Sequence, residues 1–296
     1  MTMTLEQLRV FVAVAERQHV TRAAEALNLA QSAVSAHVAA LEARHGAKLF
    51  HRVGRGIELT SAGALFLKEA HAVLARAEAA ELVLSELGGL KRGTLSVAAS
   101  QTIASYWLAR HLVAYRRAYP GVDVKLLIGN TSQVAGLVRE GTSELGFVEG
   151  QIEDSSLESE TIARDQMIVV VGQDHPWFEP KRVTFDDLHD TDWVLREPGS
   201  GTRSEFEEAL RSKKIDPTKL RVPLELPSNE AVRSAVEAGM GATALSATVV
   251  AASIEAGLLH DVGLALPDRE FHVLRHNERY KSGAATALLK NISTTK

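Results

Sequence analysis

Residues 21–63 decide the fold and read TRAAEALNLAQSAVSAHVAALEARHGAKLFHRVGRGIELTSAG. After a first helix within residues 5–17, this stretch predicts a short alanine-rich helix that ends at a tight turn. A further helix is predicted from about Gln31 to Arg44, with Gly46 as its C-terminal glycine. A basic, glycine-bearing hairpin follows over residues 49–60. Helix, turn, helix and β-wing in this order predict a winged helix-turn-helix.

The helix at 31–44 has two unlike faces. Val34, Val38 and Leu41 form one apolar stripe at helical spacing. Small and polar side chains occupy the opposite face, namely Ser32, Ser35, Ala36, Ala39 and Ala43. Such a face can approach another surface closely, although an ordinary alanine-rich helix would show the same pattern.

Composition places the chain among globular proteins. It has 296 residues with 45% hydrophobic and 24% charged residues, which suggests two or three compact units. No apolar run approaches the roughly 18–20 residues of a membrane helix. Glu6, Arg9 and Glu16 interrupt the first apolar run, so we expect no secretory signal and a soluble, cytoplasmic protein. The absence of cysteine excludes disulfides, thiolate zinc sites and cysteine nucleophiles.

Charge is distributed unevenly along the chain. The net charge is -4, with 33 basic and 37 acidic residues. Residues 1–60 contain seven basic and five acidic side chains, which leaves 26 basic and 32 acidic ones in the remainder. A slightly basic head on an acidic body is weak support for a nucleic-acid-binding head.

A long helix and an α/β region follow the wing. The helix over about 61–88 contains no proline and is too long for a compact head, so it predicts a linker and dimerisation element. Beyond residue 91, strands and helices alternate in a pattern typical of α/β folds. The predicted strands are 94–99, 122–128, 145–149, 167–172, 193–196, 221–225 and 242–246. The predicted helices are 103–119, 133–140, 202–212 and 229–237.

At this point the sequence resembles the LysR-type transcriptional regulators. The resemblance rests on LEQLRVFVAVAERQHVTRAAEALNLAQSAVSAHVAALE (5–42), on GAKLFHRVGRGIELTSAG (46–63) and on the strand SVAAS (96–100). The segments ASQTIASYWL, IGNTSQ, LGFVEG and LREPGSGTR resemble a branch that includes regulators of carbon fixation and of sulfite or sulfur assimilation.

The resemblance implies an α+β, multi-domain architecture. It implies a winged helix-turn-helix over 1–60, a linker helix over 61–90 and, over 91–296, a two-lobed α/β effector domain similar to periplasmic binding proteins. Lobe I is expected at about 91–162 and 267–296, and lobe II at about 163–266. Partners implied are double-stranded promoter DNA and further copies of the chain, as homodimers or homotetramers. No cofactor, metal or membrane partner is implied.

Six residues are candidates for DNA contact. Many family members have serine or threonine at the Ala30 position and arginine or lysine where Ala36 and Ala39 stand. This chain lacks those side chains, so the inferred base contacts are confined to Gln31, Ser32 and Ser35, with His37 as a further candidate. A glutamine amide can bond adenine, serine hydroxyls reach base edges or phosphates, and wing arginines neutralise phosphates. His37 borders the apolar stripe and is equally well read as a core residue. The candidates are Gln31, Ser32, Ser35, His37, Arg52 and Arg55.

Three polar loops predict a site for a small anion. Each follows a strand and opens a helix, where hydroxyls and free N–H groups favour anions. Simple helix capping would explain each loop singly. The candidate residues are Ser100, Gln101, Thr102, Asn130, Thr131, Glu149, Arg196, Gly199, Ser200, Gly201, Thr202 and Arg203.

Two other classes of protein remain as alternatives. A solute-binding protein of the transport type would share the two-lobed part, but the wing and the missing signal peptide speak against it. An enzyme acting on phosphate or acyl groups would use the arginine-containing loop. The sequence contains no HExxH, GxSxG or Walker motif, and GSGT at 199–202 lacks the lysine of a phosphate loop. We therefore expect a regulator and not an enzyme.

Overall fold

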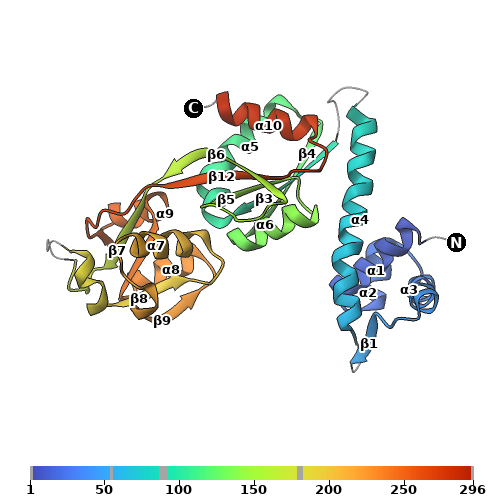
Figure 1. Cartoon of the computed structure of the whole chain (residues 1–296), viewed down its shortest axis with the longest axis horizontal. Helices are drawn as coiled ribbons and strands as arrows, with labels where there is room; N and C mark the ends of the chain where they lie inside the picture. The colour runs from blue at the N-terminus through green and yellow to red at the C-terminus, as the bar shows by residue number, and fades with distance from the viewer. Residues whose placement is uncertain (1–2, 54–55, 87–92, 179–182, 295–296) are drawn as a thin grey trace. The chain divides into compact units, whose positions relative to one another are not determined.

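A computed structural model of the chain describes residues 3–53, 56–86, 93–178 and 183–294. The chain divides between residues 87 and 88 into two compact units. The N-terminal unit is mainly helical and carries a two-stranded sheet, whereas the C-terminal unit contains two five-stranded sheets with helices on their faces (Figure 1).

The N-terminal unit is a winged helix-turn-helix, as predicted. Its elements are α1 (Leu5–Arg17), α2 (Val20–Leu27), α3 (Gln31–His45), β1 (Phe50–Val53), β2 (Gly56–Leu59) and α4 (Ser61–Glu86). The ring of Phe11 is fully buried and lies 5.3 Å from that of Phe50 and 4.8 Å from that of Phe66. One core therefore joins α1, the wing and the start of α4. Gly63 is required there because a Cβ would collide with the Leu49 carbonyl oxygen.

Two residues fix the ends of α3. Ala30 is its N-cap in extended conformation and provides no side-chain hydrogen bond, while Gly46 ends the helix with φ +62°. The carboxylate of Glu42 accepts hydrogen bonds from Leu49 N at 2.9 Å and Phe50 N at 3.2 Å, and lies 2.7 Å from Lys48 Nζ. Glu42 thereby fastens α3 to the wing.

Lobe I of the C-terminal unit is a mixed sheet in the order β4-β3-β5-β12-β6. Strands β3, β4 and β5 are parallel, and β12 runs antiparallel to both β5 and β6. The strands are β3 (Gly93–Ser100), β4 (Val122–Gly129), β5 (Leu145–Glu149), β6 (Leu157–Asp165) and β12 (Arg269–His276). The helical segments are η1 (Ile103–Leu108), α5 (Ala109–Ala118), α6 (Thr131–Glu140) and α10 (Gly283–Thr294).

The helix expected over 103–119 begins differently from the prediction. Its first part, η1, is a π-helix, and regular α-helix starts only at Ala109. π-helical turns are rare and occur often at functional sites. This irregular turn directly follows Ser100–Thr102, a loop of the predicted anion site.

Lobe II has a sheet in the order β11-β7-β10-β8-β9. The strands are β7 (Met167–Gly172), β8 (Asp192–Arg196), β9 (Arg221–Leu226), β10 (Ala242–Ser246) and β11 (Leu259–Asp261). The helices are η2 (Phe185–Asp190), α7 (Gly201–Ser212), η3 (Pro217–Lys219), α8 (Asn229–Glu237) and α9 (Ala247–Glu255). Separate apolar clusters cover the two faces of this sheet, one around Trp193 and one around Val232.

The chain crosses between the lobes twice, once from β6 to β7 and once from β11 to β12 (Figure 1). The limit expected at 162–163 falls inside β6, because Asp165 still pairs with Arg269 in the lobe I sheet. Within the part of the chain that the structure describes, no helix has the length and apolarity needed to span a membrane.

Candidate functional site

The face of α3 opposite the core is open to solvent. Its exposed residues are Gln31, Ser32, Ser35, Ala36 and Ala39. Val34 on the other face is fully buried, and His37 is half-buried between the two. Three predicted contact residues therefore share one exposed surface, with neighbours small enough for close approach to another molecule. His37 lies at its edge.

The wing, which follows α3 in the sequence, carries the basic residue Arg52 within the part of the chain that the structure describes. Arg52 is exposed on β1, where it pairs in register with Ile57 of β2. An exposed guanidinium on a hairpin suits the neutralisation of a phosphate. The other predicted wing residue, Arg55, lies outside the described residues.

The predicted anion-site residues gather where the lobes meet. The parallel strands β3 and β4 are followed at the same edge of lobe I by Thr102 and Asn130. Arg196 ends β8 of lobe II, and Thr202 lies in the first turn of α7. Sheet edges at the carboxyl ends of parallel strands are the usual ligand sites of α/β folds.

Side chains following β3 are bonded to the start of α8. Gln101 Oε1 accepts from Asn229 N at 2.8 Å, and Gln101 Nε2 donates to Glu230 at 2.7 Å. Asn229 Nδ2 donates to Thr102 Oγ1 at 2.9 Å. The Tyr106 hydroxyl of η1 adds a hydrogen bond to Glu230 Oε1 at 3.3 Å, so four hydrogen bonds connect lobe I to the first residues of one lobe II helix.

The loop after β4 reaches a different part of lobe II. Asn130 Nδ2 donates to Glu197 Oε1 at 3.1 Å, and Ser132 N donates to Gly199 O at 3.1 Å. Gly199 has φ +87°, a conformation that glycine adopts without strain. The loop following β8 therefore takes part in the lobe contact through backbone and side chain.

Arg196 is a buried cation of this region, with 4% of its side chain exposed. Its Nη1 donates to Asn229 Oδ1 at 2.5 Å, and its Nε lies 2.8 Å from Glu197 Oε2. Burial opposes ionisation of Glu197, but hydrogen bonds from Arg196 and Asn130 outweigh it and hold the pKa of this carboxyl below its ordinary value. The guanidinium is therefore neutralised by an adjacent carboxylate.

Glu149 and Gly201 make the lobe contact tight. Thr131 Oγ1 donates to Glu149 Oε2 at 3.2 Å, and both residues are buried. A Cβ on Gly201 would lie 2.5 Å from Thr131 Oγ1, so only glycine fits at the start of α7. Ser200, directly before it, is buried as the N-cap of this helix without a side-chain capping bond.

Ser100 has a hydroxyl with unused bonding capacity. The residue is 3% exposed, and its Oγ has no hydrogen-bond partner among the described residues. Buried polar atoms nearly always have a partner, so an orphan hydroxyl calls for water or a ligand. Ser100 ends β3, two residues before Thr102.

Arg203, a candidate residue of the anion site, is already paired with carboxylates. Its Nε lies 2.8 Å from Glu207 and its Nη1 lies 2.8 Å from Glu225, while Nη1 also donates to the Arg196 carbonyl. Two carboxylates within lobe II neutralise this guanidinium. Its role in the structure is to fasten α7 to β8 and β9.

Sequence reasoning missed Asn229, Glu197 and the pair formed by Arg269 and Asp165. Arg269 is 1% exposed, donates to Thr202 Oγ1 at 3.0 Å and contacts Asp165 through Nε at 2.8 Å. The Ser-Asn pair that opens a predicted helix could have indicated Asn229. Nothing in the local sequence signalled Arg269, because its partners are far away along the chain.

The comparisons with known proteins agree with this architecture. Residues 5–64 match the family "Bacterial regulatory helix-turn-helix protein, lysR family", and residues 88–295 match the "LysR substrate binding domain". A "Probable RuBisCO transcriptional regulator" of Cyanophora paradoxa is 31% identical over 296 residues, which cover 98% of this chain and 91% of the relative. This relative confirms the resemblance to the branch containing carbon-fixation regulators.

Two solved structures extend the comparison. Full-length CbnR in complex with its target DNA matches with a TM-score of 0.73 and 22% identity, over 99% of this chain and 100% of that one. The CcmR regulatory domain of Synechocystis, in complex with 2-PG, matches with a TM-score of 0.63 and 26% identity, over 69% and 97%. The relatives are regulators and not enzymes, as the sequence predicted. The chain belongs to the LysR family of transcriptional regulators, with an N-terminal helix-turn-helix domain and a C-terminal effector-binding domain.

Proposed function

We propose that this regulator binds promoter DNA sequence-specifically through α3 and the wing, and that a small anion held between lobes I and II controls this binding. The observation that carries the effector half is the buried guanidinium of Arg196 at the lobe junction, close in the hydrogen-bond network to Thr102. A fixed, desolvated guanidinium beside hydroxyls favours a carboxylate or an oxyanion, which here has to compete with the Glu197 carboxylate that neutralises Arg196.

The DNA half rests on the exposed face of α3. A glutamine amide such as that of Gln31 can bond both N6 and N7 of adenine, and Ser32 and Ser35 are short enough to reach base edges or phosphates. Arg52 supplies positive charge for the DNA phosphates, and such a contact gives affinity without sequence preference. His37, half-buried, is a secondary candidate, and Arg55 completes the proposed wing contact.

The effector half draws on chemistry at the lobe junction. The orphan hydroxyl of Ser100 and the hydroxyls of Thr102 and Thr202 are donors for an oxyanion, and Arg196 supplies charge. The similar regulatory domain of CcmR was solved with 2-PG. Sulfite, sulfate and phosphorylated or carboxylated metabolites are the leading candidates.

Anion binding changes the balance of contacts between the lobes. Glu197 and Asn229 now occupy the hydrogen-bonding positions around Arg196, and Asn130 and Thr102 connect both to lobe I. An anion that takes any of these positions alters the lobe contacts. The difference between the anion's affinities for the two lobe arrangements determines how far DNA binding shifts.

Assembly is part of the same proposal. We expect homodimers through α4, where Leu65 is 68% and Val73 is 42% exposed, and further pairing to tetramers. A cytoplasmic location follows from the proposed DNA target. Light scattering of the full chain at micromolar concentration should report dimers or tetramers, and a monomer alone would contradict the assembly.

The alternative of a transport-type solute-binding protein shares the two-lobed unit. It leaves the exposed face of α3 and the wing without a role. A gel-shift assay with the intergenic DNA upstream of the gene separates the two functions. The proposed regulator gives a specific complex that weakens with rising salt, whereas a transport protein gives none.

Calorimetry with a panel of anions tests the effector half directly. The panel contains 2-PG, inorganic phosphate, sulfate and sulfite, titrated into the full chain. Ser100→Ala and Thr102→Ala should each cost about 1–2 kcal/mol of anion affinity. Thr161→Ala is the matched control, because that exposed hydroxyl bonds Glu270 within lobe I. Binding by none of the anions, or undiminished binding by both site variants, contradicts the proposal.

A further inference from the structure

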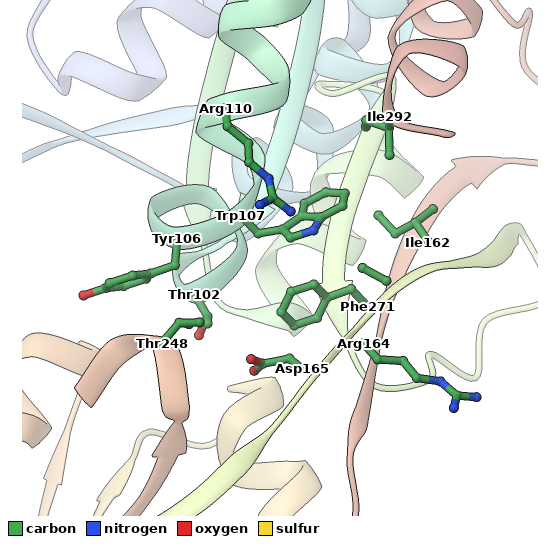
Figure 2. Close-up of a pocket in the computed structure, with 11 residues that line it drawn as sticks. Thr102, Tyr106, Trp107, Arg110, Ile162, Arg164, Asp165, Thr248, Phe271 and Ile292 are labelled. Carbon is green, nitrogen blue, oxygen red and sulfur yellow. The ribbon is translucent and has the colours of Figure 1, made fainter. Parts of the chain in front are cut away.

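Two buried guanidinium groups lie where the lobes meet, and each is already paired with a carboxylate. Arg196, with 4% of its side chain exposed, has its Nε 2.8 Å from Glu197 Oε2. Arg269, with 1% exposed, has its Nη2 2.7 Å from Asp165 Oδ2. The Asp165 carboxylate points away from Arg164, its neighbour on β6 (Figure 2), so Arg269 is the guanidinium that compensates it. Neither buried arginine therefore presents an uncompensated charge to a ligand.

Arg196 fixes the orientation of the Asn229 amide. A guanidinium group has hydrogen-bond donors and no acceptor, so the amide oxygen of Asn229 must face it. Arg196 Nη1 accordingly donates to Asn229 Oδ1, which leaves the amide nitrogen on the side of Thr102. Asn229 Nδ2 donates to Thr102 Oγ1 at 2.9 Å, because an amide nitrogen only donates. The Thr102 hydroxyl is thereby an acceptor towards lobe II.

Arg269 has the same effect on Thr202 in a single step. Its Nη1 donates to Thr202 Oγ1 at 3.0 Å, while its Nε donates to Asp165 Oδ2 at 2.8 Å. The planar guanidinium reaches the two partners through different nitrogens, whereas a lysine would have one nitrogen for both. The Thr202 hydroxyl is therefore also an acceptor, towards a buried guanidinium.

Both hydroxyls retain a proton that no described group accepts. A hydroxyl combines one donor with two acceptor sites, so accepting a hydrogen bond leaves its proton available. Thr102 and Thr202 are 2% and 3% exposed, and within the described parts of the chain neither side chain donates a hydrogen bond. Thr131 shows the contrast, because its hydroxyl donates to Glu149. Buried polar groups nearly always have partners, so the protons of Thr102 and Thr202 are suited to an acceptor from outside the chain.

The two threonines belong to one region of the lobe junction. Thr102 and Asp165 line the same pocket (Figure 2). Arg269 bonds both Asp165 and Thr202. Ser100, whose hydroxyl has no described partner, lies two residues before Thr102. Hydroxyl donors of lobe I and lobe II are thus connected through one set of buried side chains.

We propose that Asn229 and Arg269 are positioning residues, which orient the hydroxyls of Thr102 and Thr202 as hydrogen-bond donors for the effector anion. This inference rests on the proposed function, because it requires an anion between the lobes. It adds that the two buried guanidinium groups act through the hydroxyls, since a hydroxyl that accepts from a charged or polarised donor is itself a stronger donor. The group bound there only accepts hydrogen bonds, as a carboxylate or a fully deprotonated oxyanion does.

A double-mutant cycle on Asn229 and Thr102 tests the first positioning residue, with sulfate and 2-PG as calorimetric probes of the full chain. Asn229→Asp has almost the same shape, but its carboxylate only accepts, so the Thr102 proton must turn towards it. This change should weaken binding about tenfold more in the parent chain than in Thr102→Ala. Thr102→Ser keeps the hydroxyl and should show the full effect. Asn130→Asp adds the same charge beside Glu197 and should change the affinity by one factor in both backgrounds.

A second cycle, on Arg269 and Thr202, involves no change of charge. The ammonium group of Arg269→Lys can pair with Asp165, but the separate nitrogen that bonds Thr202 is lost. The substitution should weaken both probes about threefold in the parent chain and by no factor in Thr202→Ala. Arg203→Lys is the matched control, because Arg203 is likewise paired with two carboxylates. Its effect should be the same with and without the Thr202 hydroxyl.

The outcomes separate this inference from the proposed function. Equal factors in both backgrounds, in both cycles, overturn the positioning roles and leave the anion site in place. Binding of neither sulfate nor 2-PG at millimolar concentration overturns the inference, and the proposed function fails with it only if phosphate and sulfite also do not bind. If circular dichroism shows that Asn229→Asp is unfolded, the cycle with Arg269→Lys decides alone.

Discussion

The carboxylate of Glu197 lies against the guanidinium of Arg196, with Nε–Oε2 at 2.8 Å and Nη2–Oε1 at 3.1 Å. Two nearly parallel hydrogen bonds are the geometry with which arginine binds a free carboxylate. The chain therefore already presents an internal anion to its buried cation. Any external anion that uses Arg196 must compete with this carboxylate or bind beside it at the cost of repulsion.

Glu197→Gln should consequently raise the affinity for the effector anion. The amide keeps the size of the side chain and can still accept from Asn130, but it removes the competing charge. We expect a gain of about tenfold, the free energy of one charge-assisted hydrogen bond. Calorimetry against the tightest anion of the panel measures it.

Glu207→Gln is the matched control, because Glu207 also pairs with arginines of lobe II, namely Arg203 and Arg211. Its substitution should leave anion affinity unchanged. An unchanged or lower affinity in Glu197→Gln would show that Glu197 holds Arg196 in place without competing with the effector.

Arg52→Ala and Gln31→Ala should change DNA binding in two different ways. Loss of an arginine at a phosphate weakens binding to all sequences and lowers the salt slope by about one unit. Loss of the Gln31 amide should instead relax the preference for the operator by about 1–3 kcal/mol. Fluorescence anisotropy on operator and scrambled DNA at several salt concentrations separates the two effects.

Lys68→Ala provides the control for these DNA variants, because Lys68 is exposed on α4 beyond the wing. It should change neither the affinity nor the salt slope. If Gln31→Ala kept both the affinity and the preference of the parent chain, α3 would not read bases through this residue.

The winged head could be predicted from sequence because its contacts are local. Glu42 and Phe50, for example, are eight residues apart and already belong to adjacent predicted elements. Parallel strands such as β3 could also be predicted, since short runs like Val97–Ala99 are continuously apolar and buried. Local contacts and apolar runs of this kind can be predicted from residues that lie close together in the sequence.

The lobe junction could be predicted only in part. β6, with the sequence LESETIARD, is an edge strand of mostly polar, exposed or half-buried residues, so it has no apolar alternation to detect. Arg269 meets Asp165 and Thr202 across 104 and 67 residues, and Thr102 meets Asn229 across 127. The end of a predicted strand indicates where a polar loop lies. Which residues pair across such separations becomes known only from the three-dimensional fold.

Glu42→Ala should destabilise the N-terminal unit by about 1–3 kcal/mol, because it leaves the N–H groups of Leu49 and Phe50 without their acceptor. The three tryptophans are all beyond residue 100, so circular dichroism or hydrogen exchange over residues 31–60 is the suitable measurement. Glu58→Ala, at an exposed position of the wing, should have little effect.

The same carboxyl gives this unit a pH dependence. Burial of Glu42 opposes ionisation, but hydrogen bonds from Lys48, Leu49 and Phe50 prevail and lower its pKa below 4.5. A lowered pKa in the folded state contributes stability that is present above pH 4.5 and disappears as the pH falls through the folded value. Equal acid sensitivity in the parent chain and in Glu42→Ala would contradict this assignment.

Glu205 on α7 should act in the opposite direction on the C-terminal unit. Burial raises its pKa above the ordinary 4.5, Arg269 partly opposes the increase, and Glu149, Glu208 and Glu270 add to it. With a raised folded pKa, the stabilisation is complete below pH 4.5 and is lost as the pH rises through the folded value. Near neutral pH the ionised carboxylate is therefore destabilising.

Glu205→Gln removes that charge while preserving the shape of the side chain. We expect a higher melting temperature than the parent chain at about pH 7.5, with the difference shrinking as the pH approaches 4.5. Glu255→Gln, at the exposed end of α9 and not among the charges that raise the pKa of Glu205, should show no such convergence. Thermal melts followed by tryptophan fluorescence report this unit, since all three tryptophans lie in it. A melting temperature of Glu205→Gln below that of the parent at neutral pH would mean that the ionised carboxylate holds a stabilising contact with Arg269, and the like charges of Glu149 and Glu270 would then be secondary.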